Sequence, residues 1–594
     1  MFEDSIGRWV ARIARCGLSS LFVVSVLSAS AVAADVGEPQ ARVIVKFKAA
    51  SDMGRMRALS ATIGVAAARA QAMGLRLRLG LTAGGSLSDR SEVMLASGMS
   101  SEELVARLAG QADVEYAVVD QRRRFQAIPN DPLYLAGGGT GPAVGQWYLR
   151  PPSATAPASI NAEAAWDVTL GRPSVVVAVL DTGVRFDHGD LLPVGAGGNI
   201  LPGYDFISNA GTANDGNGRD ADASDPGDWI STQENAAGGA FAGCGVSNSS
   251  WHGTEVAALI SATSDNGFGM ASVGRGVLVL PVRVLGKCGG FDSDIVAAMR
   301  WAAGLAVPAV PANPNPAKVI NLSLGGSGTC SSAYIEALAE LNALGVVVVA
   351  SAGNSAGHAV SEPANCSGVI AVAGLRHVGT KVGFSDLGPQ IALSAPGGNC
   401  VDIRPGAACQ YPILTARNAG TQAAVPNSSV FSDSFQISVG TSFSAPLVSG
   451  AVGLLMSVRP ASTPSEIRTL LQQTARPFPT TGGDNSDGTV VGQCLPPQLD
   501  ATGKPIDQLQ CYCSTSTCGA GMLDVGAAVR AAAALVGAPL PTPTPTPAPT
   551  PTPTPPAAAT GDGGGGGGSF DVLWVMALFA AAHALRRPRR PTAA

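Results

Sequence analysis

Charged and aromatic side chains are scarce in this sequence. Asp, Glu, Lys and Arg make up 14% of the 594 residues, aromatic residues make up 5%, and histidine occurs five times. The formal net charge of −5 provides no basic field for nucleic acid, which excludes that class of partner. Hydrophobic residues reach 46%, with 74 glycines, which is typical of a loop-rich globular chain with buried strands and not of a disordered one.

Cysteine is nearly absent from the first part of the chain, where Cys16 stands alone before Cys244. The same N-terminal region has the pattern of an export signal, because three arginines precede the apolar stretch 18–32 and small residues at 31–33 fit a signal peptidase site. Removal of residues 1–34 leaves ten of the 11 cysteines, all between Cys244 and Cys518. An even number of cysteines in an exported protein predicts disulfides, about five at most, with the connectivity left open.

A zinc site formed by Cys511, Cys513 and Cys518 is the alternative use of the cysteines. This group has no histidine nearby and lacks the two-residue gaps that are usual in structural zinc sites. Disulfides are therefore favoured over zinc.

Residues 35–127 are predicted to form a small α+β unit. The segments 42–48 and 113–119 alternate apolar and polar residues as half-buried strands do, and helix-compatible stretches lie between them. The unit contains no histidine, so it contributes none to any acid–base chemistry.

Residues 128–536 are predicted to form a larger α/β domain. Its valine-rich apolar runs lie at 175–180, 277–285, 318–324, 346–350 and 369–373, and helical patterns lie at 294–301, 333–344 and 444–458. Continuous β-branched runs that alternate with helices predict a mostly parallel sheet covered by helices on both faces. In such sheets the chemistry is found beyond the carboxyl ends of the strands.

The C-terminal region has two predicted parts. Residues 537–568 form a linker of repeated Pro-Thr followed by a glycine run, which cannot build a core. Residues 569–594 contain an apolar stretch and then a cluster of arginines. The stretch is shorter than the ~20 residues of a comfortable membrane span, although its arginine flank fits a helix whose end stays in the cytoplasm.

One set of residues can carry out nucleophilic catalysis. Acyl transfer from a serine requires a base for the hydroxyl proton, a carboxylate to orient that base, and donors for the developing oxyanion. Asp181 ends a predicted strand, His252 opens a Gly-Thr turn and an apolar helix, and Ser442 lies where a long apolar helix begins. The other histidines lack this setting, and Ser444 is the rival nucleophile.

These segments resemble the motifs of the subtilisin-like serine protease family, peptidase S8. The aspartate motif reads Asp-Thr-Gly-Val at 181–184, the histidine motif His-Gly-Thr at 252–254, and the serine motif Gly-Thr-Ser-Phe-Ser-Ala-Pro at 440–446. Their order is that of subtilisin. The resemblance covers about residues 129–530 and implies a subtilisin-like fold and a serine-type endopeptidase. It places the reactive serine directly after the Gly-Thr pair, which favours Ser442 over Ser444.

The resemblance also implies the groups around the reacting bond. The segment 347–354 matches the strand and turn that present the family's oxyanion asparagine, so Asn354 is expected to donate alongside the N–H of Ser442. Two strand edges are expected to pair with an extended substrate. They comprise Ser323, Leu324, Gly325 and Gly326, and Ala350, Ser351, Ala352 and Gly353. The least similar segments, 399–435 and 477–518, are predicted to be surface insertions.

An acidic, glycine-rich loop at 214–225 is a candidate calcium site. Hard cations prefer carboxylate ligands, although the spacing is not that of an EF-hand and solvated loop charge is the open alternative. The resemblance adds the expectation of a structural calcium ion, because family members often bind calcium. The candidate ligands are Asp215, Asp220, Asp222 and Asp225, with Asp190 as a further one. His188 is expected to support the aspartate loop.

The resemblance assigns roles to both ends of the chain. Residues 35–127 are expected to be an inhibitory propeptide that the enzyme removes itself, with 122–125 in the cleft and cleavage between Arg124 and Asn130. The glycine run, apolar helix and arginine cluster resemble the glycine-glycine C-terminal sorting signals of Gram-negative bacteria, which a rhomboid-like protease removes. A permanent membrane anchor is the alternative.

The sequence thus predicts a secreted or cell-surface serine endopeptidase that hydrolyses extracellular proteins through an acyl-enzyme. The expected partners are protein substrates, its own propeptide, signal peptidase and the rhomboid-like protease, with membrane contact through the C-terminal tail. The alternative is a catalytically inactive binding protein on a protease scaffold. An esterase or peptide ligase would use the same residues, because the acyl-enzyme is shared.

Overall fold

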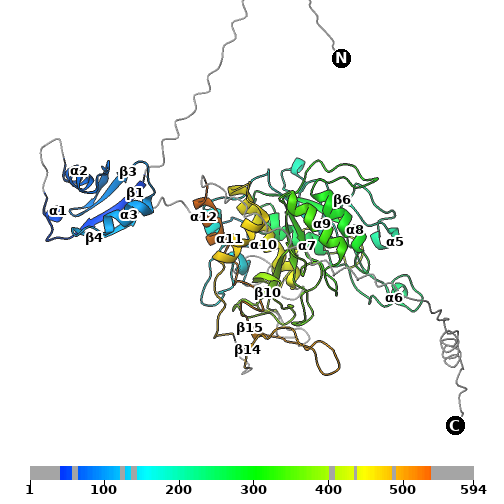
Figure 1. The fold of residues 1–594 in the computed structure, drawn as a ribbon. Helices are drawn as coiled ribbons and strands as arrows, with labels where there is room; N and C mark the ends of the chain where they lie inside the picture. The colour runs from blue at the N-terminus through cyan, green and yellow to red at the C-terminus, as the bar shows by residue number, and fades with distance from the viewer. Residues whose placement is uncertain are drawn as a thin grey trace, which may run out of the picture. The chain divides into compact units, whose positions relative to one another are not determined.

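The computed structural model describes residues 41–56, 64–120, 128–135, 144–399, 409–433, 438–483 and 490–536 (Figure 1). The predicted signal peptide, the segment 122–125, the linker, the apolar C-terminal stretch and the arginine cluster lie outside these residues. Their boundaries stay predictions.

An antiparallel sheet with helices forms between residues 41 and 119, as the sequence predicted for this small α+β unit. Its strand order is β2-β3-β1-β4. The strands are β1 (Ala41–Phe47), β2 (Thr82–Ser88), β3 (Ser91–Ala96) and β4 (Val114–Val119), and the helices are α1 (Asp52–Arg55), α2 (Val65–Leu77) and α3 (Ser101–Ala109). The β2–β3 hairpin was not foreseen, because the glycine-containing β2 is exposed and has no apolar alternation. Alternate residues of β1 pack against α2 and α3.

A seven-stranded parallel sheet in the order β11-β10-β9-β8-β5-β7-β6 confirms the predicted α/β fold. The strands are β5 (Val176–Asp181), β6 (Tyr204–Asp205), β7 (Leu278–Arg283), β8 (Val319–Leu322), β9 (Val347–Ser351), β10 (Ile370–Leu375) and β11 (Ile391–Pro396). The central strands are buried on both faces, which is why they read as continuous apolar runs. Because β5, β8 and β9 are parallel neighbours, their carboxyl ends lie at one edge.

Helices cover both faces of this sheet (Figure 1). On one face, α8 (Asp292–Ala302) and α9 (Ser332–Ala343) pack against side chains such as Ala178 and Leu180 of β5. On the other, the intervening residues Val177 and Val179 join the core around α7 (His252–Ser261) and α10 (Thr441–Val458). The same side holds α4 (Ala162–Trp166), α11 (Pro464–Thr474) and α12 (Val525–Ala534).

Helix α10 lies deep in the core. Among the described residues it is the one helix long and apolar enough to cross a membrane, but 89% of it is buried inside the protein. Small residues allow this burial: a Cβ at Gly450 would come within 2.7 Å of the Cβ of Val273. The apolar length of α10 is therefore explained by core packing.

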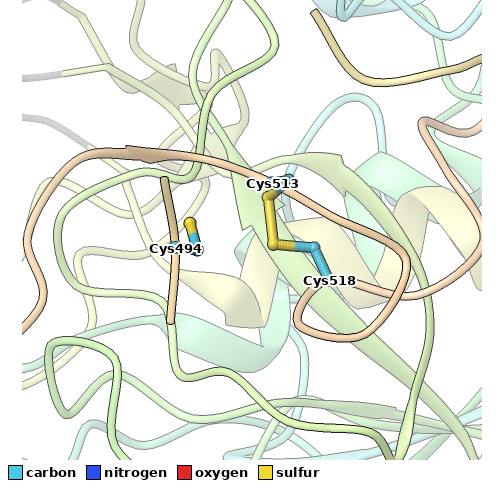
Figure 2. A group of neighbouring side chains, drawn as sticks. All are labelled: Cys494, Cys513 and Cys518. Atoms are coloured by element: carbon cyan, nitrogen blue, oxygen red, sulfur yellow. A yellow bond between two sulfur atoms is a disulfide. The ribbon is translucent and has the colours of Figure 1, made fainter. Parts of the chain in front are cut away.

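Disulfides use the cysteines of the described residues, as predicted for an exported chain. The bridges are Cys244–Cys288, Cys330–Cys366, Cys494–Cys511 and Cys513–Cys518, and Cys409 is also disulfide-bonded. Figure 2 shows the Cys513–Cys518 bridge beside Cys494, and these sulfur atoms lie within 4.8 Å of one another. Such a group resembles a zinc site by distance alone. Every member is oxidised, however, and thiolates are the form that binds zinc.

The prediction of surface insertions is wrong for the middle of the segment 399–435. Ile413 and Leu414 are fully buried. Trp147 Nε1 donates to the carbonyl of Pro412 at 2.9 Å, and the Tyr148 hydroxyl donates to that of Leu414 at 2.6 Å. The prediction was based on weak resemblance to the family motifs. Weak resemblance does not indicate exposure to solvent, so it could not predict that this segment is part of the core.

Candidate active site

Asp181 and His252 meet at the carboxyl end of β5. Asp181 is the last residue of the strand and is fully buried, and His252 is the first residue of α7. His252 Nδ1 lies 2.8 Å from Oδ1 and 2.9 Å from Oδ2 of Asp181. Gly253 permits this approach, because a Cβ there would clash with the carbonyl oxygen of Gly183. The carboxylate therefore orients the imidazole and favours the proton on Nδ1.

The loop after Asp181 is fixed by Thr182 and Asp225. The Thr182 N–H donates to Asp181 Oδ1 at 2.7 Å, and its hydroxyl donates to Asp225 Oδ2 at 2.7 Å while accepting from the N–H of Gly253 at 2.9 Å. Burial raises the pKa of Asp225 to about 7. Asp225, which the sequence suggested as a calcium ligand, thus joins the start of α7 to the end of β5.

Nearby charges set the protonation of His252. Burial alone would lower the pKa of the imidazole, but the carboxylates of Asp181, Glu255 and Asp228 outweigh this effect and raise the pKa to about 9. The imidazolium is stabilised most by Asp181, the nearest of the three.

Asp228 belongs to the site, although the sequence analysis did not predict it. Its carboxylate accepts from the N–H of Ser250 at 2.6 Å and from the Ser250 hydroxyl at 2.8 Å. The Ser250 hydroxyl in turn accepts from the N–H of His252 at 3.3 Å. Between them, Trp251 is buried with a left-handed φ of 57°, and its indole donates to the carbonyl of Gly420 at 2.7 Å. No local motif marks a carboxylate that acts through this turn.

Ser442 lies in the first turn of α10, and Pro446 explains how it is held. A proline has no N–H, so the helix leaves the carbonyl of Ser442, four residues earlier, without its usual donor. The Ser323 hydroxyl donates to that carbonyl at 2.7 Å instead. The Ser442 hydroxyl donates to the carbonyl of Ser323 at 3.3 Å, and among the described residues no hydrogen bond joins it to His252. The ring of Phe443 lies 5.7 Å from that of His252.

Ser444, the rival nucleophile, points into the core. It is fully buried, and its hydroxyl donates to the carbonyl of Pro396 at 3.1 Å. This environment gives it neither a base nor access to substrate.

Asn354 lies beside Ser442, just beyond the carboxyl end of β9. Its Oδ1 accepts from the N–H of Thr441 at 3.0 Å and from the Thr441 hydroxyl at 2.9 Å, which leaves Nδ2 as the free donor end of the amide. The position of a Cβ on Gly440 would be 3.5 Å from Asn354 Nδ2 and 3.6 Å from the N atom of Ser442. The two donors thus flank one small space, as an oxyanion hole requires.

Asp386 holds the loop that carries Asn354, and no sequence pattern pointed to it. Its Oδ1 accepts from the N–H groups of Ser355 at 2.9 Å and His358 at 3.1 Å, while its own N–H donates to the carbonyl of Gly353 at 3.0 Å. Gly353 has φ of 116°, and a Cβ there would clash with the Asp386 carboxylate. Burial raises the pKa of Asp386.

The two predicted substrate edges differ in the structure. Ser323, Leu324, Gly325 and Gly326 line a cavity of about 520 Å³ that His252 also lines. Among the described residues no backbone hydrogen bond is recorded for Leu324 or Gly325, whereas Gly326 exchanges two with Glu362. Ala350 and Ser351 are within β9, and Ala352 and Gly353 use their N–H and C=O groups internally. Leu324 and Gly325 are thus the backbone positions open to an extended peptide.

The five calcium candidates do not form one cluster. Asp215 Oδ2 accepts from Arg283 at 2.7 Å, and Asp190 accepts from Asn266 Nδ2 and from the N–H of Met270, each at 2.9 Å. Asp220 and Asp222 accept from nearby backbone N–H groups in their own loop. Among the described residues, the groups of three acidic, histidine or cysteine ligands within reach of one ion all contain cysteines. The arrangement does not fit a shared calcium cage.

His188 supports the aspartate loop through its ring. Nδ1 accepts from the N–H of Asp190 at 3.1 Å, and Nε2 lies 3.1 Å from the carbonyl of Val430. Burial lowers its pKa to about 4, so the ring is neutral and structural.

A parallel sheet with an Asp–His pair at the end of one strand, and a serine at the start of a core helix beside an amide donor, is the arrangement expected of the subtilisin-like class. The comparisons agree, because the model of the subtilase family, Peptidase_S8, matches residues 172–493. The chain belongs to the subtilase family.

The similarity to individual relatives covers different fractions of this chain and of theirs. The chain is 42% identical to an extracellular protease of Xanthomonas campestris over 64% of this chain and 58% of that one. It is 34% identical to an extracellular basic protease of Dichelobacter nodosus over 77% and 70%. A solved protease of Pseudoalteromonas arctica is 40% identical, with a TM-score of 0.54, over 68% of this chain and 99% of the solved one. The chain thus spans less than two thirds of the Xanthomonas protein.

Proposed function

We propose that the protein is a secreted serine endopeptidase that hydrolyses peptide bonds of extracellular proteins through an acyl-enzyme. In this mechanism the Ser442 hydroxyl attacks the carbonyl carbon, and His252 takes its proton and passes it to the leaving amine. Asp181 orients the ring and stabilises the imidazolium. Asn354 Nδ2 and the N–H of Ser442 stabilise the oxyanion.

The contact of Asp181 with His252 Nδ1 is the observation that carries the proposal. This contact supplies an oriented base. His252 lines the same cavity as Ser323, and Ser323 exchanges hydrogen bonds with Ser442. The Ser442 hydroxyl must give up its bond to the carbonyl of Ser323 before it can donate to His252. Catalytic hydrogen bonds are often unformed until substrate is bound.

A fluorophosphonate probe and casein digestion test the function together. The mature wild-type protein is expected to be labelled and to digest casein, and Ser442→Ala is expected to lose both. Ser444→Ala is the matched control, because its hydroxyl is buried and bonded to Pro396. A wild-type protein that neither reacts nor digests casein would instead be an inactive binding scaffold.

The N-terminal unit is proposed to be an inhibitory propeptide that the enzyme cuts off itself. Its support is an independent hydrophobic core formed by its own strands and helices. The variant Ser442→Ala is expected to accumulate as the exported, unprocessed precursor. Mature-sized protein from this variant, made in a host without other proteases, would rule out self-cleavage.

Export and C-terminal sorting complete the proposal. The names of the relatives support an extracellular location, and the arginine-flanked apolar stretch supports transient contact with the inner membrane. Mass spectrometry of both ends of the mature protein tests this. An N terminus after the signal peptide and a C terminus at the glycine run are expected, whereas an intact C terminus would indicate a permanent anchor.

A structural calcium ion is retained from the family resemblance only as a proposal about stability, and no catalytic step depends on it. Melting temperatures measured with calcium and with a chelator test this separately from activity. A higher melting temperature with calcium than with the chelator would support a calcium site. Identical melting temperatures would exclude a stabilising calcium ion.

A further inference from the structure

The cavity beside His252 has an excess of negative charge. Three carboxylates line it, from Asp228, Asp292 and Glu362, and no lysine or arginine is among its lining residues. Asp228 already supports the turn before His252 through Ser250. Asp292 and Glu362 have no such role in the catalytic machinery.

Among the described residues, the second carboxylate oxygens of Asp292 and Glu362 accept no hydrogen bond. Asp292 Oδ1 accepts from the hydroxyl of Tyr334 at 2.9 Å, and Glu362 Oε1 accepts from the N–H of Ser331 at 2.6 Å. Burial, the bond to Asp292 and the charges of both carboxylates raise the pKa of Tyr334. The two acids therefore act on the same wall of the cavity from different segments of the chain.

Within the described residues, no lysine or arginine pairs with them, and the His252 imidazolium that also lines the cavity is paired with Asp181. Among the ion pairs of the described residues, none includes Asp228, Asp292 or Glu362. Lys287 lies next to the cavity-lining Cys288, but its ammonium is 2.6 Å from Glu234 Oε1 and 4.3 Å from the ring centroid of Trp229. Lys287 is thus already paired with Glu234, away from the carboxylates of the cavity.

The rest of the lining suits the stem of a long side chain. Leu285, Ile295 and Leu324 contribute apolar surface, and a lysine or arginine can bury its methylene groups on such surface while its charged head reaches carboxylates. A peptide paired with the open backbone of Leu324 and Gly325 would direct alternate side chains to one side. One such side chain would enter the cavity.

We propose that this cavity selects substrates that carry a lysine or arginine at one position near the scissile bond, with the cationic head between Asp292 and Glu362. The inference rests on the proposed function and names a substrate class for it. The cleft thus combines general peptide-bond hydrolysis with a preference for cationic segments.

A peptide library and a matched substrate pair test this inference. Mature enzyme is incubated with a randomised peptide library, and the cut sites are read by mass spectrometry. Lysine and arginine are expected to be enriched at one position. Peptides with arginine or its neutral isostere citrulline at that position are then compared, and arginine is expected to give a kcat/KM about tenfold higher at low salt.

The double variant Asp292→Asn with Glu362→Gln tests the two acids. Each amide keeps an oxygen that can accept the existing hydrogen bond, so the variant removes charge and preserves the local contacts. The arginine preference is expected to fall to within about twofold of parity, with kcat/KM for the citrulline peptide nearly unchanged. Glu336→Gln on the exposed face of α9 is the matched control and is expected to keep the full preference.

The outcomes separate the inference from the proposed function. Absence of cleavage of any library peptide would overturn the proposed function itself. Cleavage without enrichment of lysine or arginine, or an arginine preference that survives in the double variant, would overturn only the inference.

Discussion

The proposed active site has an acid–base half and an oxyanion half, and the two are built in different ways. The acid–base half, Asp181 with His252, lies where β5 ends and α7 begins, so both residues are fixed by elements packed in the core. The oxyanion half, Asn354 with Ser442, depends on the loop after β9 and the first turn of α10. The strand and helix ends combine core packing with hydrogen bonds from Asp225 and Asp228, whereas the loop that carries Asn354 depends on hydrogen bonds to segments distant in the sequence.

That support comes partly from the divergent segment 477–518. The N–H of Gln508 donates to the carbonyl of Ala356 at 2.6 Å, and His358 Nε2 lies 2.8 Å from Asp507 Oδ1. The N–H of Gly388 also donates to the carbonyl of Thr517 at 3.0 Å. The segment 477–518 therefore contacts the loop that carries Asn354.

The largest effect is expected when the acid–base half is broken at Asp181. Asp181→Asn keeps the size of the side chain but favours the wrong tautomer of His252 and removes the charge that stabilises the imidazolium. A fall in kcat of about 10⁴-fold is expected, measured on a peptide substrate. The melting temperature shows whether the fold is kept. A loss below about tenfold in a folded variant would mean that Asp181 is not the orienting acid.

The oxyanion half is expected to be less sensitive at a single donor. Asn354→Ala removes Nδ2 but leaves the N–H of Ser442, so kcat should fall by about 100- to 1,000-fold with KM little changed. Thr441→Val removes one of the two bonds to Asn354 Oδ1 and should cost less. Steady-state kinetics of both variants check this order, and an unchanged kcat in Asn354→Ala would exclude the side chain from the oxyanion hole.

The pH profile tests the acid–base half, because His252 titrates in the working range. His252 must be neutral to accept a proton, and its pKa is raised from 6.5 to about 9. The value of kcat/KM should therefore fall about tenfold per pH unit on the acid side of the midpoint and rise towards alkaline pH. Asp228→Asn removes one of the raising charges and should move the midpoint down. A midpoint below 6.5 in the wild type would contradict this.

The residues at the ends of strands and helices could be predicted from the sequence, whereas the carboxylates that support them could not. Asp181 and His252 were predictable because β5 and α7 have strong apolar patterns that locate the strand end and the helix start. The place of Asn354 followed from its match to the family. The carboxylates of Asp228 and Asp386 were not predictable, since each acts through a turn whose partners are far away in sequence or have no motif.

Breaking the support of the oxyanion loop at Asp386 should have an intermediate effect. Asp386→Ala removes the acceptor for the N–H groups of Ser355 and His358, so Asn354 becomes less well placed. We expect kcat to fall about tenfold with KM within about twofold, since the interaction is made with the oxyanion. Asp386→Asn keeps an acceptor oxygen and should restore most of kcat. Equal losses in both variants would point to the charge and not to the hydrogen bonds.

The smallest effect is expected at the surface contact between the divergent segment and this loop. The side chains of His358 and Asp507 are 27% and 68% exposed, so the hydrogen bond between them should contribute less than about 1 kcal/mol. Asp507→Asn should change the free energy of unfolding by no more than that and kcat by less than about twofold, because the backbone bond from Gln508 to Ala356 remains. Urea unfolding and steady-state kinetics measure the two quantities. A loss of kcat as large as that of Asp386→Ala would instead mean that the side-chain pair, and not the backbone bond, holds the oxyanion loop.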